Sequence, residues 1–138
     1  MELNGLVLDY GGVMTDPGEA IDPGGEFPMA SVVRRARHAG IRTALLSNAD
    51  TGPEWPDRSE LFDVIVLSGV VGMAKPDVEI YRLTARKLGV APYTCVFVDD
   101  LRSNVSGAVA TGMVGVHHSS ISATIAELEI LFPVLARC

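Results

Sequence analysis

Four short groups of polar residues in this chain could do chemistry together: Asp9, Ser47–Asn48, Lys75 and Asp99–Asp100. Three of them directly follow short apolar runs, and Lys75 stands just before Pro76. Carboxylates brought close together repel each other and favour a cation between them. A hard divalent ion with oxygen ligands, typically Mg²⁺, meets that need. The hydroxyl, nearby backbone N–H groups and the ammonium would then hold an anion against the metal, and phosphate fits this combination best.

Taken singly, each group has an ordinary structural explanation. Asp9 would be a turn or cap residue, and Ser47–Asn48 would be loop residues. Asp99–Asp100 would form a turn and cap the next helix, and Lys75 would be a solvated surface charge. The order and placement of all four groups together favour the functional interpretation.

The elements that must position these groups follow from the apolar pattern. Runs that are apolar throughout, rather than alternating, are typical of strands buried on both faces of a parallel sheet. Glycines, an early proline and the placement of charges mark helices between the runs. The predicted strands are 6–8, 43–46, 64–67, 95–98 and 114–116, and the predicted helices are 30–39, 77–88, 104–111 and 122–131.

This alternation predicts an α/β fold: a Rossmann-like, doubly wound three-layer sandwich with a parallel sheet of about five strands. We expect one domain over residues 1–138. In such a sheet, ligands bind at the carboxyl edge of the strands, where the polar groups are expected to gather. The predicted fold therefore directs the four groups into one crevice.

Composition excludes several other classes of protein. The 138 residues are 48% hydrophobic, which is too apolar for a disordered tail. Eleven basic residues against seventeen acidic ones, a net charge of −6, argue against a nucleic-acid-binding surface. No apolar run reaches the roughly 18 residues of a membrane span. With only Cys95 and Cys138, no disulfide framework is expected, so we predict a reduced, cytoplasmic protein.

The chemistry-bearing residues resemble a known family. Leu8–Val13, Leu46–Asn48, Lys75–Asp77 and Val98–Asp100 resemble, in the right order, the four motifs of the haloacid dehalogenase-like superfamily. The stretch 97–105, with Ala108 and Gly112, is similar to the fourth motif and its helix. The resemblance covers roughly residues 3–117 and implies a phosphatase that depends on Mg²⁺ and acts on a phosphorylated substrate.

The resemblance also implies roles for individual residues. Asp9 would be the nucleophile that forms an aspartyl-phosphate, and Ser47 and Lys75 would be catalytic groups that bind the transferring phosphoryl oxygens. Backbone N–H groups near Tyr10, Gly11 and Asn48 would help to bind phosphate. The metal would be held by Asp9, the carbonyl of Gly11, Asp99 and Asp100.

Two departures from the family pattern shape the prediction. Gly11 stands where phosphatases of this family usually carry a second Asp, which protonates the leaving group and then activates water. Asp16 is the nearest substitute, but a turn-capping role with Pro17–Gly18 is the favoured explanation, and nothing in the sequence places its side chain in the site. The segments between the motifs are also too short for a helical cap domain. The segment 11–28, the loop around Trp55, a second copy of the chain in a homodimer or a large substrate would have to cover the site.

Three alternatives remain open. A dehalogenase of the same superfamily would also use Asp9, attacking carbon, but the Asp99–Asp100 pair favours a metal and hence phosphate. A phospho-acceptor regulatory module of the response-regulator type would carry its acidic pair early, whereas here the lone Asp9 comes first. The third alternative is a weakly active or inactive scaffold, because of Gly11.

Overall fold

The computed structural model describes residues 2–18, 26–51 and 58–136. Five parallel strands form one sheet in the order β3-β2-β1-β4-β5. This arrangement confirms the predicted doubly wound α/β fold, in which the chain first moves outward from β1 to one edge and then crosses back to the other. The strands are β1 (Gly5–Leu8), β2 (Arg42–Ser47), β3 (Val64–Leu67), β4 (Cys95–Asp99) and β5 (Val114–His117).

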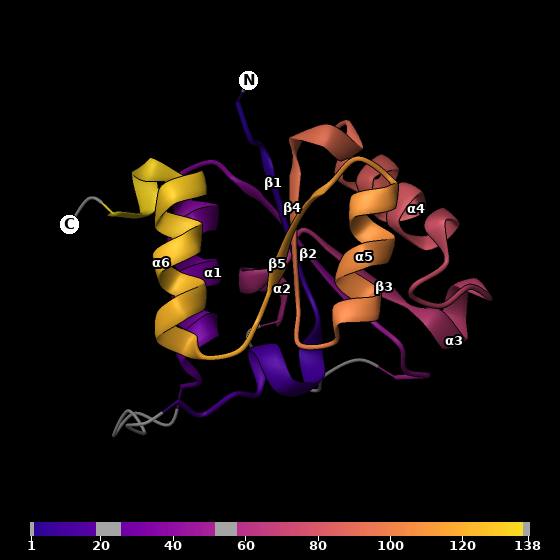
Figure 1. Ribbon diagram of the computed structural model, residues 1–138, viewed down its shortest axis with the longest axis horizontal. Helices are drawn as coiled ribbons and strands as arrows, with labels where there is room; N and C mark the ends of the chain where they lie inside the picture. The colour runs from indigo at the N-terminus through magenta and orange to yellow at the C-terminus, as the bar shows by residue number, and fades with distance from the viewer. Residues whose placement is uncertain (1, 19–25, 52–57, 137–138) are drawn as a thin grey trace.

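Helices cover both faces of the sheet (Figure 1). In the view of Figure 1, α1 (Pro28–His38) and α6 (Ile121–Leu131) lie to one side of the strands, and α4 (Val78–Leu88) and α5 (Arg102–Ala110) lie to the other. The remaining short elements are η1 (Tyr10–Met14), α2 (Arg58–Leu61), α3 (Ser68–Val71), η2 (Pro92–Thr94) and η3 (Pro133–Ala136).

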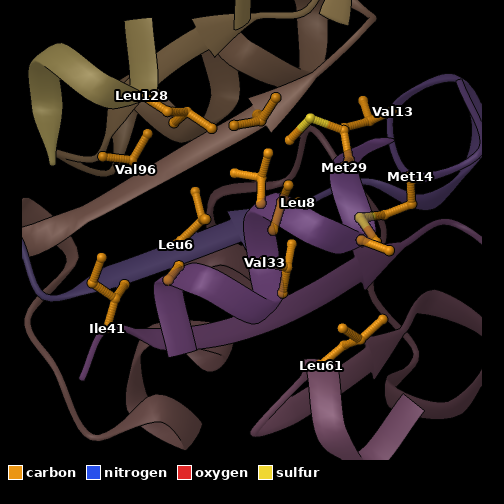
Figure 2. Packing of buried hydrophobic residues seen from close by; sticks show 14 of the residues in the cluster. Leu6, Leu8, Val13, Met14, Met29, Val33, Ile41, Leu61, Val96 and Leu128 are labelled. Atoms are coloured by element: carbon orange, nitrogen blue, oxygen red, sulfur yellow. The ribbon is translucent and has the colours of Figure 1, made fainter. Parts of the chain in front are cut away.

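The core is divided in two by the alternation of side chains along the strands. Leu6 and Leu8 of β1 pack on the α1 and α6 side, with Met29 and Leu128 among their neighbours (Figure 2). Val7, between them, belongs to the cluster on the α4 and α5 side. All four residues of β1 are buried, so the continuous apolar runs are explained by burial of both faces.

The predicted helices form with small shifts at their ends. Asp77, predicted as the first residue of a helix, is instead the N-cap of α4, and its side chain accepts a hydrogen bond from Glu79 N–H. The helix that was predicted to begin at Asn104 begins earlier in the structure, at Arg102 of α5. Gly40, with φ 90°, follows the end of α1 as the sequence predicts.

The carboxyl ends of all the strands meet at one edge of this parallel sheet. In Figure 1 the indigo turn η1, which follows β1, lies at the lower edge of the molecule. Two segments were predicted to cover that edge, the segment 11–28 and the loop with Trp55. Residues 19–25 of the first and residues 52–57 of the second lie outside the described residues. No described helix is long and apolar enough to cross a membrane.

Candidate active site

The predicted polar groups lie at the carboxyl ends of the three central strands. Asp9 comes directly after β1, Ser47 is the last residue of β2, and Asp99 is the last residue of β4. Because β1 pairs with both β2 and β4, its neighbours on either side deliver Ser47 and Asp99 to the same edge as Asp9. Lys75 arrives from the loop before α4. The sheet topology thus accounts for the meeting of residues that are far apart in the sequence.

Lys75 is not a solvated surface charge. Its side chain is 1% exposed, and its Nζ donates to Asp9 Oδ1 at 2.8 Å and to Asp99 Oδ2 at 2.9 Å. The ammonium also lies 5.5 Å from the centre of the Phe97 ring, a favourable cation–π position. The buried cation therefore bridges two carboxylates that are delivered by different strands and offsets part of their negative charge.

Asp9, Asp99 and Asp100 form a cluster that could hold a metal ion. One carboxylate oxygen from each residue lies within 4.8 Å of the other two. Asp99 is completely buried, whereas Asp9 and Asp100 are partly accessible from outside. A set of hard anionic oxygens, open on one side, matches the preference of Mg²⁺, which keeps several waters and one or two carboxylate ligands.

The electrostatics of the cluster call for a cation. Burial raises the pKa of Asp9, and the neighbouring Lys75 offsets part of this effect. Burial, followed by the hydrogen bond and the negative charge of Asp99, raises the pKa of Asp100. Both shifts reflect carboxylates that are more crowded and less solvated than in water. A bound divalent ion would instead lower the pKa of both carboxyl groups, because it stabilises their ionised forms.

Asp99 is fixed by residues to which the sequence assigned no role. Its Oδ2 accepts a hydrogen bond from Asn104 Nδ2 at 3.1 Å, and its Oδ1 accepts from Leu101 N–H at 2.9 Å. The buried Tyr81 hydroxyl in turn donates to the Asn104 carbonyl at 2.6 Å. Asn104 stands in the first turn of α5, four residues after Asp100. This spacing could have indicated the contact from the sequence, because a side chain in the first turn of a helix points back toward the end of the preceding strand.

The turn after Asp9 is shaped by two glycines with different backbones. Gly12 has φ 81°, and a Cβ there would overlap the Asp100 carboxylate. Gly11 has φ −66° and ψ 127°, which any residue can adopt, and beyond its chain neighbours a Cβ there would meet no described residue within 4 Å. Gly12 N–H donates to the Thr15 hydroxyl at 3.0 Å. Gly12 thus lets the turn approach Asp100, whereas Gly11 leaves open space.

Asp16 is engaged in structure. Its Oδ1 accepts from Gly18 N–H at 2.9 Å, as the turn-capping interpretation predicts. Its Oδ2 lies 2.7 Å from Nε2 of the buried His118, whose Nδ1 lies 2.7 Å from the Thr124 hydroxyl. The Gly18 N–H bond, and then His118, lower the pKa of Asp16. An ionised carboxylate that is bonded through both oxygens is a poor general acid.

Asn48 directs its side chain to the backbone of Lys75. Its Oδ1 accepts from Lys75 N–H at 2.9 Å, and its Nδ2 donates to the Lys75 carbonyl at 3.0 Å. The sequence predicted a phosphate-binding role for the backbone N–H of Asn48, and this side-chain arrangement was not anticipated. Ser47 is nearly buried at the end of β2. Tyr10 is half-buried and packs against the core cluster on the α1 side.

Comparison with known proteins agrees with the geometry. A family profile described as a haloacid dehalogenase-like hydrolase matches residues 19–112. The sesquiterpene phosphatase astK of Aspergillus oryzae is 34% identical over 75% of this chain and 55% of its own length. Phosphatase MT3486 of Mycobacterium tuberculosis is 33% identical over 59% of this chain and 40% of its own. The chain thus spans about half, or less, of these relatives.

The fold has a solved counterpart of similar extent. An uncharacterized protein from Corynebacterium glutamicum superposes with a TM-score of 0.83 over 95% of this chain and 96% of its own, at 28% identity. In the described part of the chain, helices and strands of the core follow each other directly, and no cap domain interrupts them. With the family profile covering more than half of its residues, this chain belongs to the haloacid dehalogenase-like hydrolases, and the short connections between its described core elements fit the capless type.

Proposed function

We propose that this chain is a Mg²⁺-dependent phosphatase that works through an aspartyl-phosphate on Asp9. The observation that carries the proposal is the position of Lys75 Nζ, bonded to both Asp9 and Asp99 beside the third carboxylate of Asp100. A nucleophilic carboxylate, a buried cation and an open acidic cluster are the parts that phosphoryl transfer requires. Two of the relatives carry the name phosphatase, which supports a phosphorylated substrate, and we take phosphate monoesters as the class to test.

The residues of the chain divide the work between them. An Asp9 carboxylate oxygen attacks phosphorus while the bond from phosphorus to the leaving oxygen breaks, giving an acyl phosphate and an alkoxide or phenoxide. Lys75 and Ser47 stabilise the negative charge on the phosphoryl oxygens, together with the backbone N–H groups of Tyr10, Gly11 and Asn48. Water then attacks the acyl phosphate, which releases inorganic phosphate and restores Asp9.

Asp9, Asp99, Asp100 and the Gly11 carbonyl would hold the Mg²⁺ ion. When bound, the ion screens the repulsion between the anionic nucleophile and the anionic phosphate. Asp99 is suited to the role because Asn104 and Leu101 fix its carboxylate. The acidic pair also favours a phosphatase over a dehalogenase, which would have no need of a metal.

The experiment that tests this function is a phosphatase screen with Mg²⁺ on the wild type and on Asp9→Asn. We expect turnover of phosphate monoesters by the wild type, and a loss of at least about a thousandfold in Asp9→Asn, because the amide is not a nucleophile. A metal chelator should abolish activity, and added Mg²⁺ should restore it. If Asp9→Asn kept the activity, the mechanism would be wrong; activity on haloacids without a metal would assign a dehalogenase instead.

A further inference from the structure

Asn48 is hydrogen-bonded to the main chain of the lysine at the centre of the site, and the role predicted for Asn48, a backbone N–H that binds phosphate, does not account for this side-chain contact. Its side-chain amide pairs with both polar backbone groups of Lys75, at 2.9 Å and 3.0 Å. The two residues are 27 positions apart in the sequence. A planar amide that donates to the carbonyl and accepts from the N–H of one residue makes the same pair of hydrogen bonds that the backbone of a neighbouring β-strand would make.

The loop around Lys75 depends on this contact. Ala74 and Pro76, on either side, are exposed, whereas Lys75 itself is 5% exposed. Pro76 has no N–H to contribute, and Asp77 N–H bonds the Ala74 carbonyl. Among the described residues, the hydrogen bonds that hold the Lys75 backbone both come from Asn48.

The position of the ammonium follows from the position of this backbone. Nζ reaches Asp9 at 2.8 Å and Asp99 at 2.9 Å, and both carboxylates are held by strands of the central sheet. A loop that moves by about 1 Å would lengthen these contacts and weaken charge stabilisation by up to a hundredfold. With its oxygen and one of its amide protons engaged, the Asn48 side chain serves the lysine rather than the substrate.

We propose that Asn48 is a positioning residue that sets the place of Lys75 between Asp9 and Asp99. The kinetic consequences rest on the proposed phosphatase function, but the positioning itself does not. Asn48→Ala should therefore change the accessibility of Lys75 whether or not the chain hydrolyses phosphate.

The sequence offers an unusually direct measurement, because Lys75 and Lys87 are its only lysines. Reductive methylation, followed by peptide mass spectrometry, reports both amines in one sample, and the exposed Lys87 serves as an internal standard. In the wild type, Lys75 should react at least about tenfold more slowly than Lys87, because it is buried and ion-paired. In Asn48→Ala the Lys75 rate should rise about tenfold, with the Lys87 rate unchanged.

Two further variants make this result interpretable. Asn48→Asp keeps the size and the acceptor for Lys75 N–H but sets a carboxylate oxygen against the Lys75 carbonyl, so the Lys75 rate should fall between those of the wild type and Asn48→Ala. Asn4→Ala, in an exposed residue before β1 at the opposite edge of the sheet, should leave both rates unchanged. Circular dichroism at the labelling temperature verifies that each variant is folded. An unchanged Lys75 rate in folded Asn48→Ala or Asn48→Asp would overturn the proposal.

A double-mutant cycle separates positioning from direct substrate binding. Asn48→Ala alone should lower kcat by about tenfold to a hundredfold, with a smaller effect on KM. Added to Lys75→Ala, the same substitution should lower kcat by less than about threefold, since no lysine remains to be positioned. Effects that multiply fully in the double variant would overturn the proposal and make the Asn48 side chain a ligand of the substrate.

Discussion

Gly11 is the residue at which this chain departs from the usual pattern of its family, and the structure describes the consequence. Among the described residues, none apart from its chain neighbours comes within 4 Å of the place where a Cβ would stand, so no described side chain takes the place of a substituent there. Asp16, the next carboxylate after Gly11 along the chain, is held by Gly18 and His118 instead. We therefore expect protonation of the leaving group to be the weak step of the reaction.

The first prediction concerns the leaving group. An aryl phosphate, which needs little protonation, should be hydrolysed much faster than an alkyl phosphate of similar size. Gly11→Asp should raise alkyl-phosphate turnover by about tenfold or more, a part of the roughly 10²–10⁴-fold that fully effective general acid catalysis supplies. The backbone at φ −66° and ψ 127° accepts an Asp without strain. Steady-state kinetics on both substrates tests this, with Gly11→Asn as the uncharged control.

Two outcomes would contradict this prediction. Equal rates on aryl and alkyl phosphates in the wild type would mean that another group already acts as the acid. The same conclusion would follow if Gly11→Asp and Gly11→Asn left alkyl-phosphate turnover unchanged.

A second prediction at this scale concerns Asp16 and pH. Its pKa is lowered in the folded protein, so the folded state holds the ionised form more strongly than the unfolded state does. This contribution to stability is complete above the unfolded pKa near 4 and is lost as the pH falls through the lower, folded value. Wild type should be more stable than Asp16→Asn near pH 6, and the difference should shrink toward about pH 3. Urea unfolding of both proteins measures it; a difference independent of pH would contradict it.

At the scale of elements, the turn η1 follows Asp9, the proposed nucleophile, and lies against Asp100 of the acidic pair. Gly12 brings the backbone against Asp100, and its φ of 81° is a conformation that other residues adopt only with strain. Because Asp100 is one of the proposed metal ligands, the geometry of the turn at Gly12 and that of the proposed metal site are connected.

Gly12→Ala should therefore damage both stability and metal binding. The left-handed backbone alone costs about 1–2 kcal/mol, and displacement of Asp100 adds to it, so the melting temperature should fall by roughly 3–8 °C. The stabilisation that Mg²⁺ gives to the wild type should also be reduced. Gly11→Ala, one residue earlier with an ordinary backbone and open space, is the matched control. Melting temperatures of both variants, measured with and without Mg²⁺, test this prediction. Equal melting temperatures for Gly12→Ala and Gly11→Ala would refute the connection between the turn and the metal site.

Much of the fold could be predicted from the sequence because burial on both faces leaves continuous apolar runs. Even the weak run at 114–116 forms a strand, β5, whose Gly115 admits Val105 and Val109 of α5. The carboxyl-edge rule likewise predicted where Asp9, Ser47 and Asp99 would meet. The short elements η1 and α3 were not predicted, because a single turn has no hydrophobic period to detect.

The contacts that complete the site escaped prediction for a different reason. Asn48 and Lys75, like Asp16 and His118, are joined by hydrogen bonds between segments distant in the sequence. A polar residue in a loop carries no sign of its partner, since its type fits a turn equally well. The burial of Lys75 was equally hidden, because it results from the packing of the loop onto β1 and β4 rather than from its neighbours in sequence.

At the scale of the whole molecule, the question is what excludes water from the site. The described residues add no cap to the core, yet an acyl phosphate intermediate is best protected from uncontrolled contact with solvent. The part of the segment 11–28 that is described is tied by Asp16 to His118 at the start of the β5–α6 connection, which limits how far it can reach over Asp9. We therefore expect the cover to come from outside the described core.

The last prediction is that a second copy of the chain, or a large substrate, supplies this cover. If the cover is a homodimer, small-angle scattering should give the mass of two chains, and specific activity should fall on dilution as the dimer dissociates. If the chain is a monomer, kcat/KM should be much higher for a phosphorylated macromolecule than for small phosphate esters, because only the large substrate closes the site itself. Either result accounts for a core without a cap. A monomer that turns over a small metabolite rapidly would contradict both, and would require residues of the chain itself to exclude water.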